Sequence, residues 1–463
     1  MRKSWIWFLY LLSVGGGAQV ALAQQGIDSQ VKEAIQKSFQ NSKELQIKSL
    51  ELDKTEMEAA EVKGKKLPHV EATGLYGFLY SNGSLDLPTW TIPGTGLGLF
   101  EGASNFSTRT QAAYAGVSVK QILFSGTQIP NGEKAIAAKA EAQTYLVQAS
   151  RETMAKDILT TFDQVMLLHE VDKLIVDSEK RLKKEQVKVN QAIANGLAIP
   201  YDRDKLKLAL LELESKKVEL AGARNLLVKK LRQETGLSEE EILHIQYQLD
   251  AMPIAEMPLD AQQRSELQAL TASGKAYDFL YKKEKGGALP MFFAFGSASY
   301  LNIFDTHLNL KSVPLLGNVD LKANSLQGRP NLMVGVGAKW EIFSGGEHKS
   351  KIRQRQLDQE INQVKLRDTE EKLNLLLEKN KVSYQNANQK LNVGQQQLKV
   401  AENSLVMASK QYQAGLIAVT DFLASENDWY RVNLGYYSTV IEQRAAALEL
   451  LHSAGKLLQT IYE

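Results

Sequence analysis

The sequence contains no cysteine, so neither disulfides nor lipid attachment through cysteine contributes to the fold. The sequence also lacks an excess of charge of either sign. The 55 Lys and Arg residues balance 53 Asp and Glu residues, which gives no electrostatic argument for nucleic-acid binding. Beyond the first 23 residues, no run of ~18 consecutive apolar residues could form a transmembrane helix.

Motifs that carry chemistry are absent as well. The six histidines have no metal-ligand spacing, and the sequence contains neither a Walker-type phosphate loop nor a nucleophile elbow. We therefore predict that the chain is not an enzyme and that it has no catalytic, metal or cofactor site.

The first residues predict export. Two basic residues precede an apolar run from Trp5 to Val14, and Ala21-Leu22-Ala23 supplies a small-residue cleavage site. These features predict a signal peptide over residues 1–23 and a mature chain that begins near Gln24. An exported chain without apolar helices can enter a membrane only as a β-barrel.

The longest uninterrupted segment, Glu347 to Gln413, predicts a helical rod of roughly 100 Å. Two rows of residues recur in it at intervals of seven, one mostly large and one mostly small, as a coiled coil requires. The large row is Leu377, Tyr384, Leu391, Leu398, Leu405 and Tyr412, and the small row is Asn380, Ala387, Gly394, Ala401, Ala408 and Gly415.

The two ends of this rod carry different signals. Before it, from Asn331 to Phe343, apolar residues occupy every second position, which predicts a strand with one apolar face. After it, Gly415 can adopt the left-handed conformation that ends helices, and Thr420 or Asp421 can cap the next helix.

The first half of the chain predicts the same order of elements. A helix from Ile27 to Lys66 precedes a strand from His69 to Tyr80, a Gly- and Ser-rich loop from Ser81 to Thr108, and a strand ending at Phe124. A rod after Pro130 and a returning helix follow. Their seven-spaced rows are Leu168, Ile175, Leu182 and Val189, and Leu206, Leu213, Leu220 and Leu227.

This shared order indicates an internal repeat, because four anchors recur in one order at offsets of about 219 to 222 residues. Leu67-Pro68 matches Leu289-Pro290, Phe124-Ser125-Gly126 matches Phe343-Ser344-Gly345, Asn195-Gly196-Leu197 matches Ala414-Gly415-Leu416, and Asp202 matches Asp421. We predict a first repeat over residues 24–236, a linker over residues 237–260 and a second repeat over residues 261–463.

The predicted strands constrain the assembly. Two strand pairs of about 10 to 13 residues are long enough to cross an outer membrane, but four strands cannot close a barrel. Since open edges are not tolerated in lipid, several copies must contribute strands to one wall. The alternative is a periplasmic coiled-coil adaptor or scaffold whose strands form soluble hairpins and never insert.

The duplicated Phe-Ser-Gly junctions, the Gly-Leu tips each followed by an aspartate, and Arg264-Ser-Glu-Leu-Gln-Ala-Leu270 resemble the TolC family of outer-membrane efflux proteins. The resemblance covers nearly all of the mature chain. It implies an α+β membrane protein, a homotrimer in which each protomer gives four strands to one transmembrane β-barrel. Its long antiparallel coiled-coil helices would build an α-helical barrel that forms a tunnel through the periplasm.

The resemblance also implies a function and partners. Such channels lie in outer-membrane lipid and dock through their helix tips onto a periplasmic adaptor, or membrane fusion protein, and an inner-membrane pump. They serve tripartite efflux or type I secretion systems and passively conduct drugs, metals or secreted proteins to the exterior.

Site residues follow from the same resemblance. The tips Gly196, Leu197, Gly415 and Leu416 match the adaptor-docking positions, and Asp202, Asp421 and Tyr412 match a periplasmic gate. Where the family has a second aspartate and an arginine, this sequence has Ala424 and Ile417, and Glu426 is a candidate substitute for the missing carboxylate. From the residues alone, both aspartates can also be helix caps.

Overall fold

The chain forms two compact units, and the computed structural model describes residues 27–86, 88, 91–96, 103–255, 257–313, 317–328 and 330–462. We call the first the coiled-coil unit: the residues up to Lys43, Ser150–Gln263 and Leu373–Glu463. The second, the sheet unit, consists of Glu44–Ala149 and Arg264–Lys372. Each unit takes segments from both predicted sequence repeats. The predicted signal peptide lies outside the described residues.

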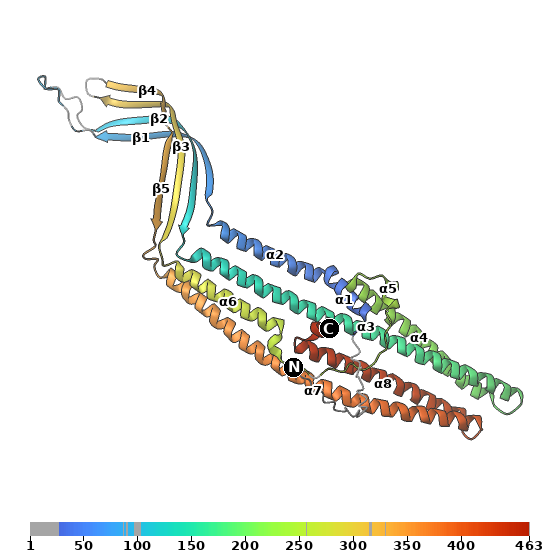
Figure 1. Cartoon of the computed structure of the whole chain (residues 1–463). Coiled ribbons are helices and arrows are strands. Elements are labelled where there is room, and N and C mark those ends of the chain that lie inside the picture. The colour runs from blue at the N-terminus through green and yellow to red at the C-terminus, as the bar shows by residue number, and fades with distance from the viewer. Residues whose placement is uncertain are drawn as a thin grey trace, which may run out of the picture. The chain divides into compact units, whose positions relative to one another are not determined.

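The helices repeat in length between the two halves of the chain (Figure 1). The rods α3 and α7 each contain 67 residues, and the helices that return from them contain 36 and 35. The helices are α1 (Ser29–Asn41), α2 (Lys43–Gly64), α3 (Gln128–Ala194), α4 (Pro200–Thr235), α5 (Glu239–His244), α6 (Ser265–Gly286), α7 (Glu347–Gln413), α8 (Val419–Ser453) and α9 (Leu457–Tyr462). In the described part of the chain, no helix has the length and hydropathy needed to cross a bilayer.

Seven-residue spacing correctly predicted the buried rows of the coiled-coil unit. Ile175, Leu182 and Val189 of α3 meet Leu206, Leu213 and Leu220 of α4 in one buried cluster. In α7, both rows contribute buried residues: Leu377, Leu391 and Leu405 from the large row, and Asn380, Ala387, Ala401 and Ala408 from the small row. Small residues therefore let neighbouring helices approach, as a knobs-into-holes arrangement requires.

One predicted helix was wrong. Residues 27–66 form two helices, because Ser42 adopts an extended conformation with ψ 119° between α1 and α2. The amide N–H of Ser42 donates to the carbonyl oxygen of Ser38, which closes α1 before α2 begins.

The predicted linker, residues 237–260, contains α5, belongs to the coiled-coil unit and contacts a buried ion pair between α3 and α8. Arg444 of α8 donates to both carboxylate oxygens of Asp163 of α3 at 2.8 Å and to the Asp250 carbonyl oxygen at 2.9 Å. The Tyr247 hydroxyl donates to Asp163 at 2.6 Å. Burial raises the pKa of Tyr247, so its hydroxyl stays protonated and remains a donor.

The sheet unit contains one antiparallel sheet in the order β1-β2-β3-β4, with β5 also on β3. Its strands are β1 (His69–Asp86), β2 (Ala103–Phe124), β3 (Met291–Val313), β4 (Gly317–Gln327) and β5 (Asn331–Lys339). The strands β1 to β3 are longer than the predicted 10 to 13 residues. The predicted loop from Ser81 to Thr108 was too long, because paired strand continues to Asp86 opposite Ala103.

The five strands of the sheet occupy four side-by-side positions, which we call lanes, because β4 and β5 share one position beside β3. β4 pairs with the Asn302–Val313 part of β3, and β5 pairs with its Met291–Ser299 part, so they follow one another along the same edge (Figure 1). The lane is interrupted near Pro330, which has no N–H to donate. β5 ends at Lys339, four residues earlier than predicted. Within the described residues, neither β1 nor the β4–β5 lane has a strand on its outer edge.

The buried ion pair gives a first prediction. Arg444→Ala leaves the Asp163 carboxylate buried without its partner, and we expect the free energy of unfolding to fall by about 3–5 kcal/mol. Arg232→Ala is the matched control, because Arg232 pairs with Glu239 at 3.1 Å on the exposed surface and such pairs contribute about 0–1 kcal/mol. Urea titration followed by circular dichroism measures both. Equal effects of the two variants would show that the Arg444 pair is not buried in solution.

Candidate functional site

The two helix tips have the same backbone geometry. The residue after each rod's last turn has a positive φ, 72° at Gly196 and 73° at Gly415. The following amide closes back onto the helix, from Leu197 N to Ala192 O at 2.8 Å and from Leu416 N to Gln411 O at 2.9 Å. The predicted left-handed end at Gly415 is thus confirmed. Leu197 and Leu416 are both exposed, so each tip presents an apolar side chain.

The predicted gate aspartates are each the third residue of a returning helix. The Asp421 carboxylate accepts a hydrogen bond from the N–H of Ala418 at 3.4 Å and so helps to close the start of α8. The N-cap position itself belongs to Ala418, not to Thr420 or Asp421. In the described part of the chain, no group donates a hydrogen bond to Asp202, although its position near the start of α4 suits a negative charge.

Tyr412 lies where the α3–α4 hairpin meets the α7–α8 hairpin. Its ring stacks on Phe422, with the centroids 5.2 Å apart and the planes 11° from parallel. Burial raises the pKa of Tyr412, and the negative charges of Glu185 and Asp202 raise it further. Tyr412 therefore lies close enough to Asp202 in one chain for the charge of Asp202 to raise its pKa. Asp421 instead lines a groove of about 500 Å³ between α7 and α8.

Glu426 does not replace the missing gate carboxylate as an open charge. It is buried, and Arg181 of α3 holds it with three hydrogen bonds of 2.7 to 3.1 Å. The Arg181 guanidinium also lies 4.1 Å from the Trp429 ring centroid. Glu426 therefore ties α8 to α3. Sequence reasoning missed this role, although a buried seven-spaced row contained the signal: Val419, Glu426, Asn433, Val440 and Ala447.

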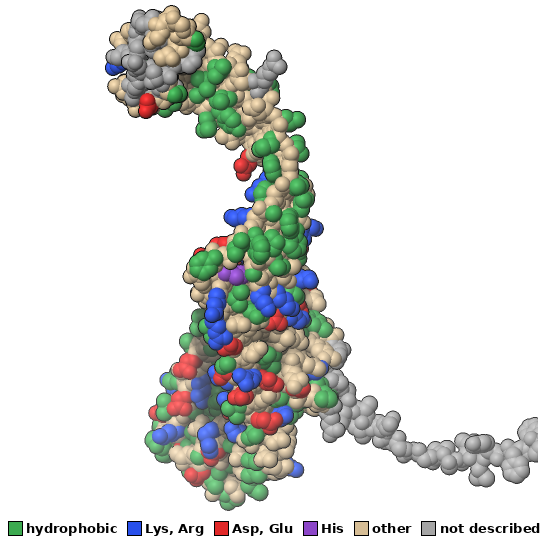
Figure 2. Space-filling model, turned by 90° about the vertical axis from the view of Figure 1, so that its left-hand side faces the viewer, with side chains coloured by type: hydrophobic (Ala, Val, Ile, Leu, Met, Phe, Trp, Pro, Cys, Tyr) green, Lys and Arg blue, Asp and Glu red, His purple; other side chains and the backbone are tan. Residues whose placement is uncertain are grey.

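A second candidate surface is one face of the sheet. Cross-strand register places six exposed aliphatic side chains on this face: Val70, Val117, Val119, Leu332, Val334 and Val336. Aromatic side chains lie at both ends of this aliphatic patch: Tyr76, Phe78 and Tyr80 at one, and Phe124 and Phe292 at the other. Figure 2 shows hydrophobic side chains gathered over the sheet, whereas charged ones are dense over the helices.

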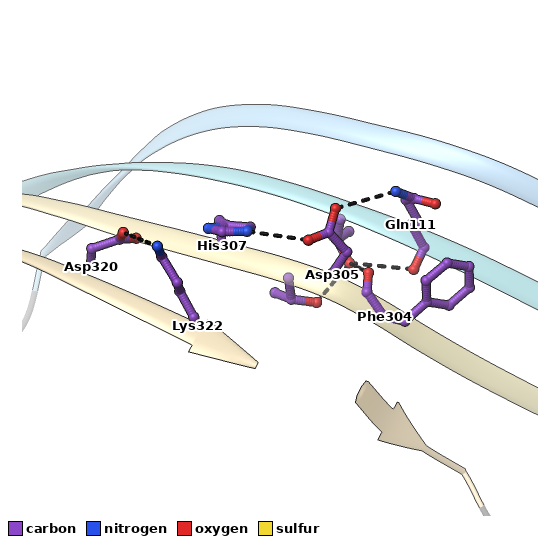
Figure 3. Close-up of polar contacts among 8 residues, drawn as sticks. Gln111, Phe304, Asp305, His307, Asp320 and Lys322 are labelled. Carbon is purple, nitrogen blue, oxygen red and sulfur yellow. Dashed lines mark hydrogen bonds and ion pairs between the residues drawn. The ribbon is translucent and has the colours of Figure 1, made fainter. Parts of the chain in front are cut away.

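Beyond this patch, a group of polar residues surrounds a bulge in β3 (Figure 3). Asp305 has a positive φ of 52°, and its carboxylate accepts from the Gln111 amide at 3.3 Å and lies 3.2 Å from His307 Nε2. Lys322 pairs with Asp320 at 3.6 Å. These charges are paired with one another. Among the described residues, no three His, Asp or Glu side chains are placed to hold a metal ion.

Solved structures share this fold along nearly the whole chain. VceC, an outer membrane protein of Vibrio cholerae, has a TM-score of 0.66 and 14% identity, and the match covers 92% of this chain and 96% of that one. The Campylobacter jejuni CmeC outer membrane channel has a TM-score of 0.69 and 13% identity, covering 93% and 86%. A Pseudomonas aeruginosa membrane protein has a TM-score of 0.71 and 11% identity, covering 93% and 94%. The fold is that of the outer-membrane channels.

Part of the sequence matches a family model. Residues 313–455 match the outer membrane efflux protein family. No curated protein matches the chain significantly. The family match of this segment and the shared fold agree with the resemblance to the TolC family of outer-membrane efflux proteins.

The two aspartates give the second prediction. Unit charges ~6 Å apart interact by roughly 1 kcal/mol in water. Carboxylates at the entrance of a channel should therefore attract cations, and removing these two from each chain should lower cation selectivity by about threefold or more. We expect Asp202→Ala with Asp421→Ala to show this loss, and reduced block by divalent cations, in single-channel recordings. Glu240→Ala, which removes an exposed carboxylate of α5, is the control. Unchanged selectivity in an inserted double variant would leave the aspartates with helix capping alone.

Proposed function

We propose that this protein is the outer-membrane channel of a tripartite efflux or type I secretion system. It would conduct substrates passively from a periplasmic adaptor and an inner-membrane pump to the exterior. The observation that carries this proposal is the sheet, which combines an exposed apolar face with two unpaired edges. The match of residues 313–455 to the outer membrane efflux protein family supports the proposal independently.

The exposed face suits contact with lipid. An aliphatic band bounded at both ends by aromatic side chains is the pattern of a barrel wall, where the aromatic residues lie at the two membrane interfaces. A folded protein in water would be expected to cover a continuous apolar face of this kind. The alternative function, a periplasmic scaffold that never inserts, leaves this face without a partner.

The unpaired edges require further copies of the chain. Backbone N–H and C=O groups at an open edge cost several kcal/mol each in hydrocarbon, so the four-lane sheet must be closed by other sheets. Three copies would give twelve lanes in one barrel, the assembly that the TolC resemblance implies. The helices would then form the periplasmic tunnel, and the protein itself would catalyse no reaction.

The tips are the proposed adaptor contact. Leu197 and Leu416 are exposed apolar residues held by rigid turns at the ends of two rods. Apolar side chains with a fixed backbone are suited to a protein interface, because little conformational freedom is lost on binding. Asp202, Asp421 and Tyr412 follow or precede these tips and would form the periplasmic gate.

Membrane partition tests the proposal directly. We expect the mature protein to fractionate with the outer membrane and, after detergent extraction, to migrate as a trimer that dissociates only on heating. Insertion is driven by the apolar face, so Val334→Arg with Val336→Arg should reduce the membrane fraction. An arginine on the lipid-facing side at mid-membrane costs about 2–4 kcal/mol. A monodisperse monomer in the soluble periplasmic fraction would end the channel interpretation.

The role of the tip is tested by changing its backbone. Gly415→Val opposes the positive φ by about 1 kcal/mol or more, because the β-branched side chain disfavours the left-handed conformation. We expect export to be lost while trimer formation and insertion persist, as measured by substrate accumulation in cells. Ala414→Val adds similar bulk one residue earlier, where φ is not positive, and should export normally. Normal export by Gly415→Val would make the tip no more than a turn.

A further inference from the structure

The face of the sheet opposite the aliphatic patch has a different composition. Between the helices and the bulge in β3, the described strands place no charged residue on the patch face. On the opposite face they place Lys120, Lys339 and His69 against one carboxylate, Glu71. Lys339 follows Lys120 by 219 residues, one of the offsets of the internal repeat, so both repeats supply this lysine. We call this side of the sheet the charged face.

A groove of about 500 Å³ lies on the charged face, at the end of the sheet where α2 leads into β1. Strand register places Lys120 of β2 between His69 of β1 and Phe295 of β3. The side chains that give the groove its chemistry are Lys65, His69, Glu71, Lys120, Phe295 and Met333. A volume of this size is typical of sites that hold a drug-sized molecule.

Two aromatic rings are held in place on this face by glycines of β5. The ring centroids of Phe293 and Phe295 are 6.1 Å apart, and their planes are 46° from parallel. A Cβ on Gly335 would be 2.9 Å from the Phe295 ring, and a Cβ on Gly337 would be 2.6 Å from the Phe293 ring. Glycine is therefore needed at both positions for the rings to lie across β5. Rings positioned in this way can contact another aromatic ring.

The groove also has an excess of positive charge. Lys120 is exposed, its Nζ lies 4.6 Å from the Phe293 ring centroid, and no carboxylate of the described residues is paired with it. Lys65 is 3.7 Å from Glu61, which does not line the groove. Two lysines against the single carboxylate of Glu71 leave one net positive charge when histidine is neutral. The groove therefore combines a cation with an aromatic surface.

We propose that this groove binds exported substrates that carry both an aromatic ring and a negative charge, such as aromatic carboxylates or sulfonates. The inference rests on the proposed function, because the charged face lines the interior of a barrel only if the aliphatic patch faces lipid. Lys120 would pair with the anionic group of the substrate, and Phe295 would contact its ring. The groove would thus act on substrates as they pass through the barrel.

The two halves of the groove select for different properties of a substrate. Lysines that line a pore favour anions over cations, so Lys120 selects for charge. The ring of Phe295 selects for an aromatic group, because contact between aromatic rings is favourable beyond the apolar area that it buries. The groove is open on the charged face, and a lysine in contact with water binds an anion only weakly. A bound substrate can therefore leave again, as conduction requires.

Block of the ion current in planar bilayers measures binding in the groove. Three probes are added in turn on the exterior side: naphthalenesulfonate, which has the ring and the negative charge, methanesulfonate, which lacks the ring, and naphthylmethylammonium, which has the opposite charge. We expect the half-blocking concentration of naphthalenesulfonate to be about fivefold or more below that of either other probe, because it alone uses both parts of the groove.

Variants assign the block to the groove. Lys120→Gln removes the charge and should raise the half-blocking concentration of naphthalenesulfonate about fivefold, whereas Lys120→Arg keeps the charge and should match the parent protein. Phe295→Leu should raise it about threefold. Lys311→Gln is the control, because it removes an exposed lysine near the far end of β3. Calorimetric titration of the nanodisc-embedded protein with naphthalenesulfonate should give the same order of affinities without depending on conduction.

The outcomes separate this inference from the proposed function. Equal block of the parent protein and Lys120→Gln by naphthalenesulfonate, or stronger block by naphthylmethylammonium, would overturn the groove as an anion site. In both cases the parent protein would still conduct ions, so the channel would stand. An inserted parent protein that conducts no ions would overturn both proposals.

Discussion

The structure depends on one constraint, the need of every backbone N–H and C=O group at the edge of a sheet for a hydrogen-bond partner. β1 and the β4–β5 lane each leave one edge unpaired in the described chain. In water such edges invite aggregation, and in lipid they are not tolerated. The apolar face makes this constraint stricter. It suits contact with lipid, and lipid is the environment in which an unpaired edge costs the most free energy. The proposed assembly of several chains into one wall would satisfy both demands.

The helical part answers a different demand, that of holding long rods close together without a globular core. Seven-spaced rows are buried in this packing, and in α7 one row is mostly of large residues and the other mostly of small ones. Two buried carboxylates of these helices are paired with arginines, Glu426 with Arg181 and Asp163 with Arg444. These pairs fix which helices meet, since a mismatch would leave a buried charge alone. The tips can then keep exposed apolar residues on a rigid backbone.

Sequence reasoning recovered the features that are periodic or repeated. The bounds of α7, the buried rows and the turn at Gly415 all follow from spacing and from glycine. It failed where tertiary context decided the outcome. Ser42 breaks a segment that has no Gly or Pro before Gly64, and paired strand extends to Asp86 through residues typical of loops. Glu426 appeared to be a free carboxylate because its partner Arg181 lies 245 residues away. For Asp202 and Asp421, local sequence indicates capping and the TolC resemblance implies gating, and the structure adds a capping bond for Asp421 alone.

The central claim is that several copies of this chain close one barrel by pairing the open edges of their sheets. Cryo-electron microscopy of the detergent-extracted or nanodisc-embedded protein tests it most directly, because the strands of the wall can be counted and traced. The account predicts three chains and twelve lanes, with the outer edge of each β1 paired to a strand of a neighbouring chain. A particle in which β1 and β5 of the same chain pair with each other, or in which both edges remain open to lipid, would contradict it.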